Sequence, residues 1–149
     1  HSFPTRRSSD LLNFTRETEA AFNFYKTVFG TEYTHAPMRF GDVPSSPGSP
    51  GIPEEDKKLI MHAELPILGG HILMGTDAPE SMGFKLIPGN NVYIMLQPDT
   101  RKETKKLFDA LAEGGLVEQD LQDMFWGDYY GSCKDKFGVQ WMFNCTEKK

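Results

Sequence analysis

The sequence predicts an α+β fold built from two βαβββ modules, and three observations lead to this prediction. The order of one strand, one helix and three strands occurs twice along the chain. Each helical segment begins near a threonine and ends at a glycine, Gly30 in the first and Gly114 in the second. The last hairpin of each half turns at a glycine, Gly69 or Gly138. A repeat of this kind indicates two copies of one supersecondary unit.

The first module starts with a strand that ends in "LLNF", residues 11–14. Residues 15–30, "TRETEAAFNFYKTVFG", are predicted to form a helix that is capped by Thr15 or Thr18 and ended by Gly30. Its predicted buried face has apolar residues at helical spacing: Ala21, Phe24, Tyr25 and Val28.

Three strands are predicted to complete this module. The first is residues 31–40, "TEYTHAPMRF". Residues 41–57 follow and are dense in Pro, Gly and Ser, which predicts a mobile loop or an arm that crosses to a partner. Residues 58–67 and 69–77 are predicted to form a hairpin about a tight connection at Leu68 to Gly70.

The second module repeats this order. Residues 90–99 are predicted to form a strand and residues 100–115 a helix that starts at Thr100. Residues 116–127 hold a further element, and residues 128–144 two more strands. One domain therefore spans residues 11–145, with modules at 11–76 and 89–145, a linker at 77–88 and a tail at 146–149. Residues 1–10, "HSFPTRRSSD", show no periodicity, and we expect them to be foreign sequence that replaces the true start.

The composition is that of a soluble globular protein, with 38% hydrophobic and 25% charged residues. A net charge of −5 argues against a nucleic-acid partner, because no basic stripe is present to neutralise phosphates. Cys133 and Cys145 are too few for a disulfide framework, so reduced thiols and a cytoplasmic location are expected. No apolar run approaches the roughly 18 residues that a membrane-spanning helix needs.

Three segments together resemble a known family: "LNF…TEAAFNFYKTVFG", "MHAELPILGGHILMG" and "WGDYYGSCKDKFGVQWMFN". They resemble the vicinal oxygen chelate superfamily of glyoxalase, bleomycin-resistance and dioxygenase proteins, within it the PhnB-like branch, which is often labelled 3-demethylubiquinone methyltransferase-like. The resemblance implies a curved mixed sheet around a cavity, with the helices on the convex side, and a homodimer. A methyltransferase function is not expected, because no Gly-rich loop joins a strand to a following helix.

Strand alternation then predicts which side chains face the cavity. Seven residues are predicted to bind a ligand: His62, Glu64, His71, Tyr93, Trp126, Gln140 and Met142. For Trp126 and Tyr130 the alternative is that they only plug the mouth of the cavity. Leu73 and Gly75 are predicted to share the face of His71, and Asn91, Met95 and Asn144 also to face inward. Val92, Ile94 and Leu96 are predicted to pack on the second helix.

The resemblance also implies four metal positions, one on the first and one on the last strand of each module. It places three of them at Leu73, Met142 and Asn91, and the fourth in or beside the foreign N-terminus. Leucine and methionine offer no ligand for a hard cation, and asparagine is a poor one. No metal and no other cofactor is therefore expected.

Several roles remain open for His62, Glu64 and His71. They could hydrogen-bond one another, form a displaced metal site, provide a general base through a His–Glu pair, or simply be a polar ladder. Two functions follow as alternatives. One is a metal-free protein that binds a small organic molecule, and the other is a glyoxalase-like lyase or isomerase. A pure interaction module is the third class.

Overall fold

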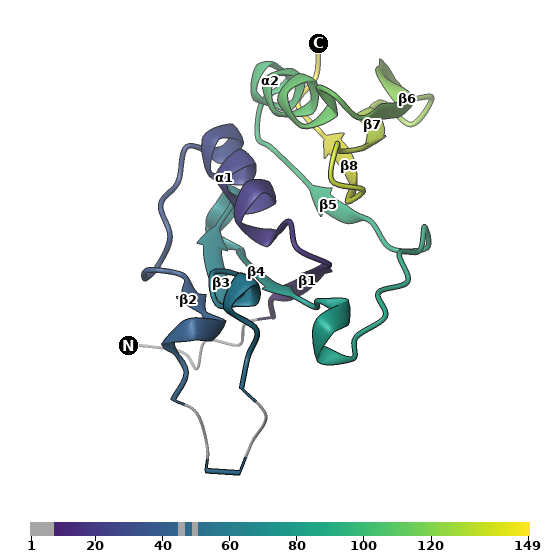
Figure 1. The fold of residues 1–149 in the computed structure, drawn as a ribbon. Helices are drawn as coiled ribbons and strands as arrows, with labels where there is room; N and C mark the ends of the chain where they lie inside the picture. The colour runs from purple at the N-terminus through teal and green to yellow at the C-terminus, as the bar shows by residue number, and fades with distance from the viewer. Residues whose placement is uncertain (1–7, 45–46, 49–50) are drawn as a thin grey trace. The chain divides into compact units, whose positions relative to one another are not determined.

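A computed structural model describes residues 8–44, 47–48 and 51–149 of the chain. The chain divides into two compact units, the first ending at Leu86 and the second spanning Ile87–Lys149. Each unit contains one α-helix and one mixed four-stranded sheet in the order βαβββ (Figure 1). The α+β fold with two such modules is therefore confirmed. Residues 1–7, within the segment expected to be foreign, lie outside the described residues, whereas Asp10 is already part of the first strand.

The N-terminal unit pairs its strands in the order β1-β4-β3-β2, and only β1 and β4 run parallel. Its elements are β1 Asp10–Phe14, α1 Thr18–Phe29, β2 Met38–Arg39, β3 Ile60–Pro66 and β4 Ile72–Asp77. Helix α1 packs on β3 and β4. The tight connection predicted between the last two strands is confirmed as a 3₁₀ turn at Leu68–Gly70.

Helix α1 ends as predicted, at Gly30 with a φ of 64°. Its start differs from the prediction, because no threonine side chain caps it. The buried carboxylate of Asp77, at the end of β4, instead accepts a hydrogen bond from the Thr18 backbone N–H at 3.0 Å. Its other oxygen accepts one from the Ile60 N–H at 2.8 Å. Asp77 therefore joins α1, β3 and β4.

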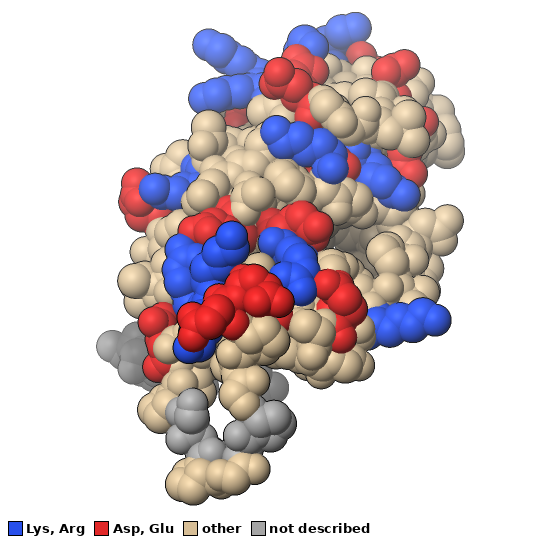
Figure 2. Space-filling view, in the orientation of Figure 1, with Lys and Arg blue, Asp and Glu red and all other residues tan. Residues whose placement is uncertain are grey.

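Two predictions for residues 31–57 are wrong in part. Residues 31–37 are not a strand, and β2 is limited to two residues after Pro37, which has no N–H to donate to a sheet. The loop at 41–57 is anchored at its end by Asp56, which is fully buried and binds Arg16 at 2.7 Å. Arg16 also binds Glu80 at 2.9 Å. Figure 2 shows acidic and basic side chains interleaved on the viewed face of this unit. Residues 45–46 and 49–50 of that loop lie outside the described residues.

The C-terminal unit pairs its strands in the equivalent order β5-β8-β7-β6. Its elements are β5 Ile94–Leu96, α2 Arg101–Ala112, β6 Leu116–Asp123, β7 Tyr129–Lys134 and β8 Gln140–Cys145. The predicted cap of α2 is confirmed, because Thr100 Oγ1 accepts a hydrogen bond from the Glu103 N–H at 3.1 Å. The buried core of this unit joins α2 to β8 through Phe108 and Phe143, whose ring centroids are 5.4 Å apart.

Strand β5 is shorter than predicted, and Val92 lies before it with 72% of its surface exposed. The prediction that Val92 packs on the second helix is therefore wrong, whereas Ile94 and Leu96 are buried as predicted. The side chain of Gln140 contacts the segment before this strand. Its Nε2 donates a hydrogen bond to the Val92 carbonyl at 2.8 Å, two residues before β5 begins.

The register of β3 and β4 decides which side chains share a face. Leu65 lies opposite Leu73, and Glu64 lies opposite Met74. Leu73 is fully buried, and a Cβ added at Gly75 would lie 2.5 Å from the Phe22 ring of α1. Leu73 and Gly75 therefore face the helix, and their predicted cavity position is wrong. We call the opposite face of each sheet, which points away from its own helix, the helix-free face.

Candidate functional site

Four polar side chains meet on the helix-free face of the N-terminal unit: Thr34, His35, His62 and Glu64, here named the histidine–glutamate cluster. Nε2 of His62 lies 2.9 Å from Oε1 of Glu64. Oε2 of Glu64 accepts a hydrogen bond from the Thr34 hydroxyl at 3.2 Å and lies 3.6 Å from Nε2 of His35. The two imidazole rings are nearly parallel, with centroids 6.3 Å apart. One carboxylate therefore contacts three polar groups.

The cluster is open to solvent in part, since 32% of the His62 side chain and 30% of the Glu64 side chain are exposed. The hydrogen bond from His62 lowers the pKa of Glu64 most. The hydrogen bond from Thr34 and the nearby charge of His35 also lower it. Glu64 is therefore an ionised acceptor at neutral pH. It can hold the ring of His62 in one orientation and one tautomer.

The loop before β2 places Thr34 and His35. The Thr34 backbone N–H donates to the Glu64 carbonyl at 3.3 Å, so the chain continues the sheet edge without forming a regular strand. His35 then projects beside His62. Neither residue was predicted from the sequence, because residues 31–40 were expected to form a strand. The available signal was Pro37, which has no N–H to donate to a neighbouring strand and so argues against a strand that runs through residues 31–40.

His71 does not belong to the cluster, so its predicted place beside His62 and Glu64 is wrong. It precedes β4, and its Nε2 lies 2.9 Å from a carboxylate oxygen of Asp10 in β1. Asp10 lies directly opposite Leu73 in the sheet, so its side chain is on the same face as that of Leu73, the face that carries α1. His71 therefore takes part in a pair at the end of the sheet, away from Glu64.

The C-terminal unit has a second group of side chains on its helix-free face, and it includes the predicted residues Tyr93 and Trp126. We name it the aromatic face, formed by the pair Tyr93 and Glu118 and the pair Trp126 and Tyr130. The hydrogen bond to Glu118 raises the pKa of Tyr93 most, and Tyr130 also raises it, which links the two pairs. The Tyr93 hydroxyl donates to Glu118 at 3.0 Å, and the rings of Trp126 and Tyr130 meet edge to face with centroids 6.4 Å apart. Trp126 is 48% exposed and Tyr93 38%. Glu118 was missed because the bulged pairing of β6 with β7 hides its alternation.

Gln140 and Met142 have different surroundings. Gln140 is 4% exposed and bonds to the Val92 carbonyl, which is a structural contact. Met142 lies opposite Met95 of β5 and Ser132 of β7, on the same face as Tyr130. Met142 therefore lies on the face that carries Tyr130, whereas Gln140 holds the segment before β5 by one hydrogen bond.

The residues at the family's metal positions do not fit a metal ion. Because Leu73 faces α1, the neighbouring residue on the helix-free face of β4 is Met74, whose partner in β1 is Leu11. With Met142 and Asn91 in the second unit, this set has no imidazole, carboxylate or thiolate. In the parts of the chain that the structure describes, no three His, Cys, Asp or Glu side chains are arranged to hold a metal ion. A displaced site at His62, Glu64 and His71 is not formed.

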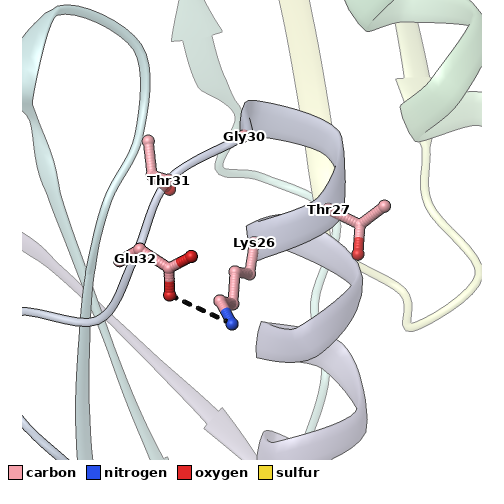
Figure 3. A pocket seen from close by; sticks show the side chains of 5 residues that line it. All are labelled: Lys26, Thr27, Gly30, Thr31 and Glu32. Carbon is pink, nitrogen blue, oxygen red and sulfur yellow. Dashed lines mark ion pairs between the residues drawn. The ribbon is translucent and has the colours of Figure 1, made fainter.

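A hollow of about 300 Å³ lies at the C-terminal end of α1 and is lined by Lys26, Thr27, Gly30, Thr31 and Glu32 (Figure 3). Lys26 and Glu32 form an ion pair across it, with 3.1 Å between Nζ and Oε2. Its lining is polar and holds neither of the two groups above. Among the described helices, none has the length and apolar character needed to cross a membrane.

Comparisons with known proteins agree with this fold. The family model of the Glyoxalase/Bleomycin resistance protein/Dioxygenase superfamily matches residues 10–143. Protein YjdN of Escherichia coli K12 is 29% identical over 150 residues, which cover 95% of this chain and 96% of that protein. The crystal structure of protein PA1353 from Pseudomonas aeruginosa has 33% identity and a TM-score of 0.81, covering 97% of this chain and 100% of that one.

A third relative supports the resemblance in fold alone. The PhnB protein from Bacillus cereus has 23% identity and a TM-score of 0.69, covering 94% of this chain and 99% of that one. The structural neighbours of the chain thus include a PhnB protein.

Proposed function

Since the chain belongs to the glyoxalase/bleomycin resistance protein/dioxygenase superfamily, we propose that it binds a small organic molecule on the helix-free side of its sheets, without a metal ion. The observation that supports this most is the histidine–glutamate cluster. Its carboxylate is partly exposed and contacts two imidazoles and a hydroxyl. Hydrogen-bond donors and acceptors therefore converge on one place. A few convergent polar groups on a formed surface are typical of small-molecule sites.

The test is a ligand-observed NMR screen of small organic acids, amides and heteroaromatic compounds. Bound compounds are then measured against His62→Ala and against His71→Ala as the matched control. Both changes remove one partly exposed histidine from the same unit. His62→Ala is expected to weaken binding and His71→Ala to leave it unchanged. Equal binding to both variants and the wild type, or no bound compound at all, would contradict the proposal.

A second candidate function, a metal-free lyase or isomerase, is favoured by the His62–Glu64 pair itself. In the tautomer whose Nε2–H donates to Glu64, Nδ1 of His62 is left as the ring atom that can accept a proton. Such a base would remove a proton next to a carbonyl group. Deuterium exchange into hydroxyacetone, followed by NMR in heavy water, tests this chemistry. Exchange above the rate of the His62→Ala variant would support it, and equal rates would exclude it.

The proposal includes a homodimer, as the family resemblance implies, and a cytoplasmic location. The two cysteines are free and buried, which agrees with a reducing compartment. Sedimentation analysis tests the dimer. A mass of twice that of the chain is expected, and a single monomeric species at micromolar concentration would contradict it.

A further inference from the structure

We propose that the aromatic face of the C-terminal unit binds a planar organic cation. This inference goes beyond the proposed function, because it concerns a second site, in the C-terminal unit, and gives the chemical class of the ligand that this site would take. Two independent features of the face support it. One is the arrangement of its rings, and the other is a carboxylate whose charge is not neutralised by a basic side chain.

The rings are held in place by the turn that joins β6 to β7. The Met124 backbone N–H donates to the Asp128 carbonyl at 2.8 Å, and the Gly127 N–H donates to the Met124 carbonyl at 2.8 Å. Gly127 has a φ of 97°, which favours glycine and fixes the turn. On this turn Trp126 meets Tyr130 at an interplanar angle of 67° and keeps 48% of its surface exposed. The Phe125 ring also meets the indole edge to face, with centroids 4.9 Å apart, so the turn carries an exposed cluster of three aromatic rings.

Aromatic faces attract cations, because the ring quadrupole is negative above and below its plane. Trp binds cations best among the aromatic side chains, and flat ligands gain further contact by stacking. The rings alone would also accept a neutral flat molecule. The charge of the ligand is therefore decided by the second feature, the carboxylate of Glu118.

Glu118 accepts the hydrogen bond of Tyr93 at 3.0 Å. Within the described residues, no lysine or arginine forms an ion pair with it. The hydrogen bond to Glu118 raises the pKa of Tyr93, so this phenol remains a neutral donor at physiological pH. Asp128, two residues after Trp126, accepts a hydrogen bond from Asn144 at 2.9 Å and has Lys148 4.0 Å away. Glu118 is thus the group that a ligand's positive charge would complement.

The test compares three flat bicyclic probes of similar size: cationic N-methylquinolinium, neutral quinoline and anionic naphthalene-2-sulfonate. The chain has two tryptophans, so an NMR spectrum shows two indole N–H signals. Trp141 is fully buried and its Nε1–H donates to Asp135, which makes it an internal control. N-methylquinolinium is expected to shift the Trp126 signal and not the Trp141 signal. Trp126→Phe assigns the two signals.

Affinities from calorimetry then separate charge from stacking. Glu118→Gln keeps an acceptor for Tyr93. It is expected to lower the affinity for N-methylquinolinium by about fivefold and to leave the affinity for quinoline unchanged. Glu113→Gln, an exposed position after α2, makes the same change in net charge and is expected to have no effect. Equal affinity for the cation and for quinoline, or no shift of the Trp126 signal, would overturn the inference. Compounds that depend on His62 would in that case still support the proposed function.

Discussion

Nε2 of His62 lies 2.9 Å from Oε1 of Glu64, two residues further along β3 on the same face of the sheet. The alternation of a strand brings these two side chains together, and the loop before β2 adds Thr34 and His35. Because this pairing lowers the pKa of Glu64, it makes the stability of the fold depend on pH in a defined direction.

The folded-state pKa of Glu64 is below its unfolded value, first because of the His62 hydrogen bond. Its contribution to stability is then present above the unfolded value of about 4.3 and is lost as the pH falls through the lower folded value. A double-mutant cycle of His62→Ala and Glu64→Gln is expected to show favourable coupling at neutral pH that disappears on acidification. Urea unfolding at a series of pH values measures it. Coupling that stays constant down to strongly acidic pH would contradict the pairing.

Phe22→Ala should destabilise the protein by about 3–5 kcal/mol, because it empties a large fully buried position of α1. Val92→Ala should cost less than about 0.5 kcal/mol, because Val92 is 72% exposed. Free energies of unfolding from urea titrations compare the two. A large loss in Val92→Ala would show that this side chain is covered in solution.

Gly75→Ala tests the face assigned to β4. The added methyl group would lie 2.5 Å from the Phe22 ring and 2.9 Å from Thr18, so about 1–3 kcal/mol of overpacking is expected. Gly51→Ala is the control, because nothing lies within 4 Å of its Cβ position. Combining Gly75→Ala with Phe22→Leu should recover part of the loss. A neutral Gly75→Ala would place Gly75 on the helix-free face, as the sequence alone predicted.

Cys133 should not react with thiol reagents in the folded protein at neutral pH. Burial raises its pKa to about 12, with Asp135 and Glu118 acting in the same direction, and only the thiolate is a strong nucleophile. Labelling with iodoacetamide, followed by mass spectrometry, is expected to proceed in urea and not in its absence. Rapid labelling of the native protein would contradict the buried position on β7.

The sequence predicted the elements well where local signals are strong. Thr100 and Gly114 frame α2 as expected, and Gly30 ends α1. The sequence did not predict which side chains of β4 face α1. The segment "HILMGTD" places apolar residues on both faces of the strand, so its pattern does not distinguish the two faces. The register is decided instead by the hydrogen bond from the Ile67 N–H to the His71 carbonyl, which depends on the turn geometry.

The candidate site was predicted in part for the same reason. His62 and Glu64 lie on one strand, so their common face follows from alternation alone. The contact of His35 with Glu64 joins residues far apart in sequence through an irregular loop, and local patterns do not encode such contacts. The buried Asp77, which binds the start of α1, was hidden in the same way.

A crystal structure of the protein soaked with the compounds that bind in the NMR screen tests the central claim most directly. In wild-type crystals, density for an organic molecule is expected within hydrogen-bonding distance of His62 or Glu64, on the helix-free face of β3. This density is expected to be lost in His62→Ala crystals and kept in His71→Ala crystals. Density for bound compounds only at other places, with the His62–Glu64 pair unchanged, would contradict it.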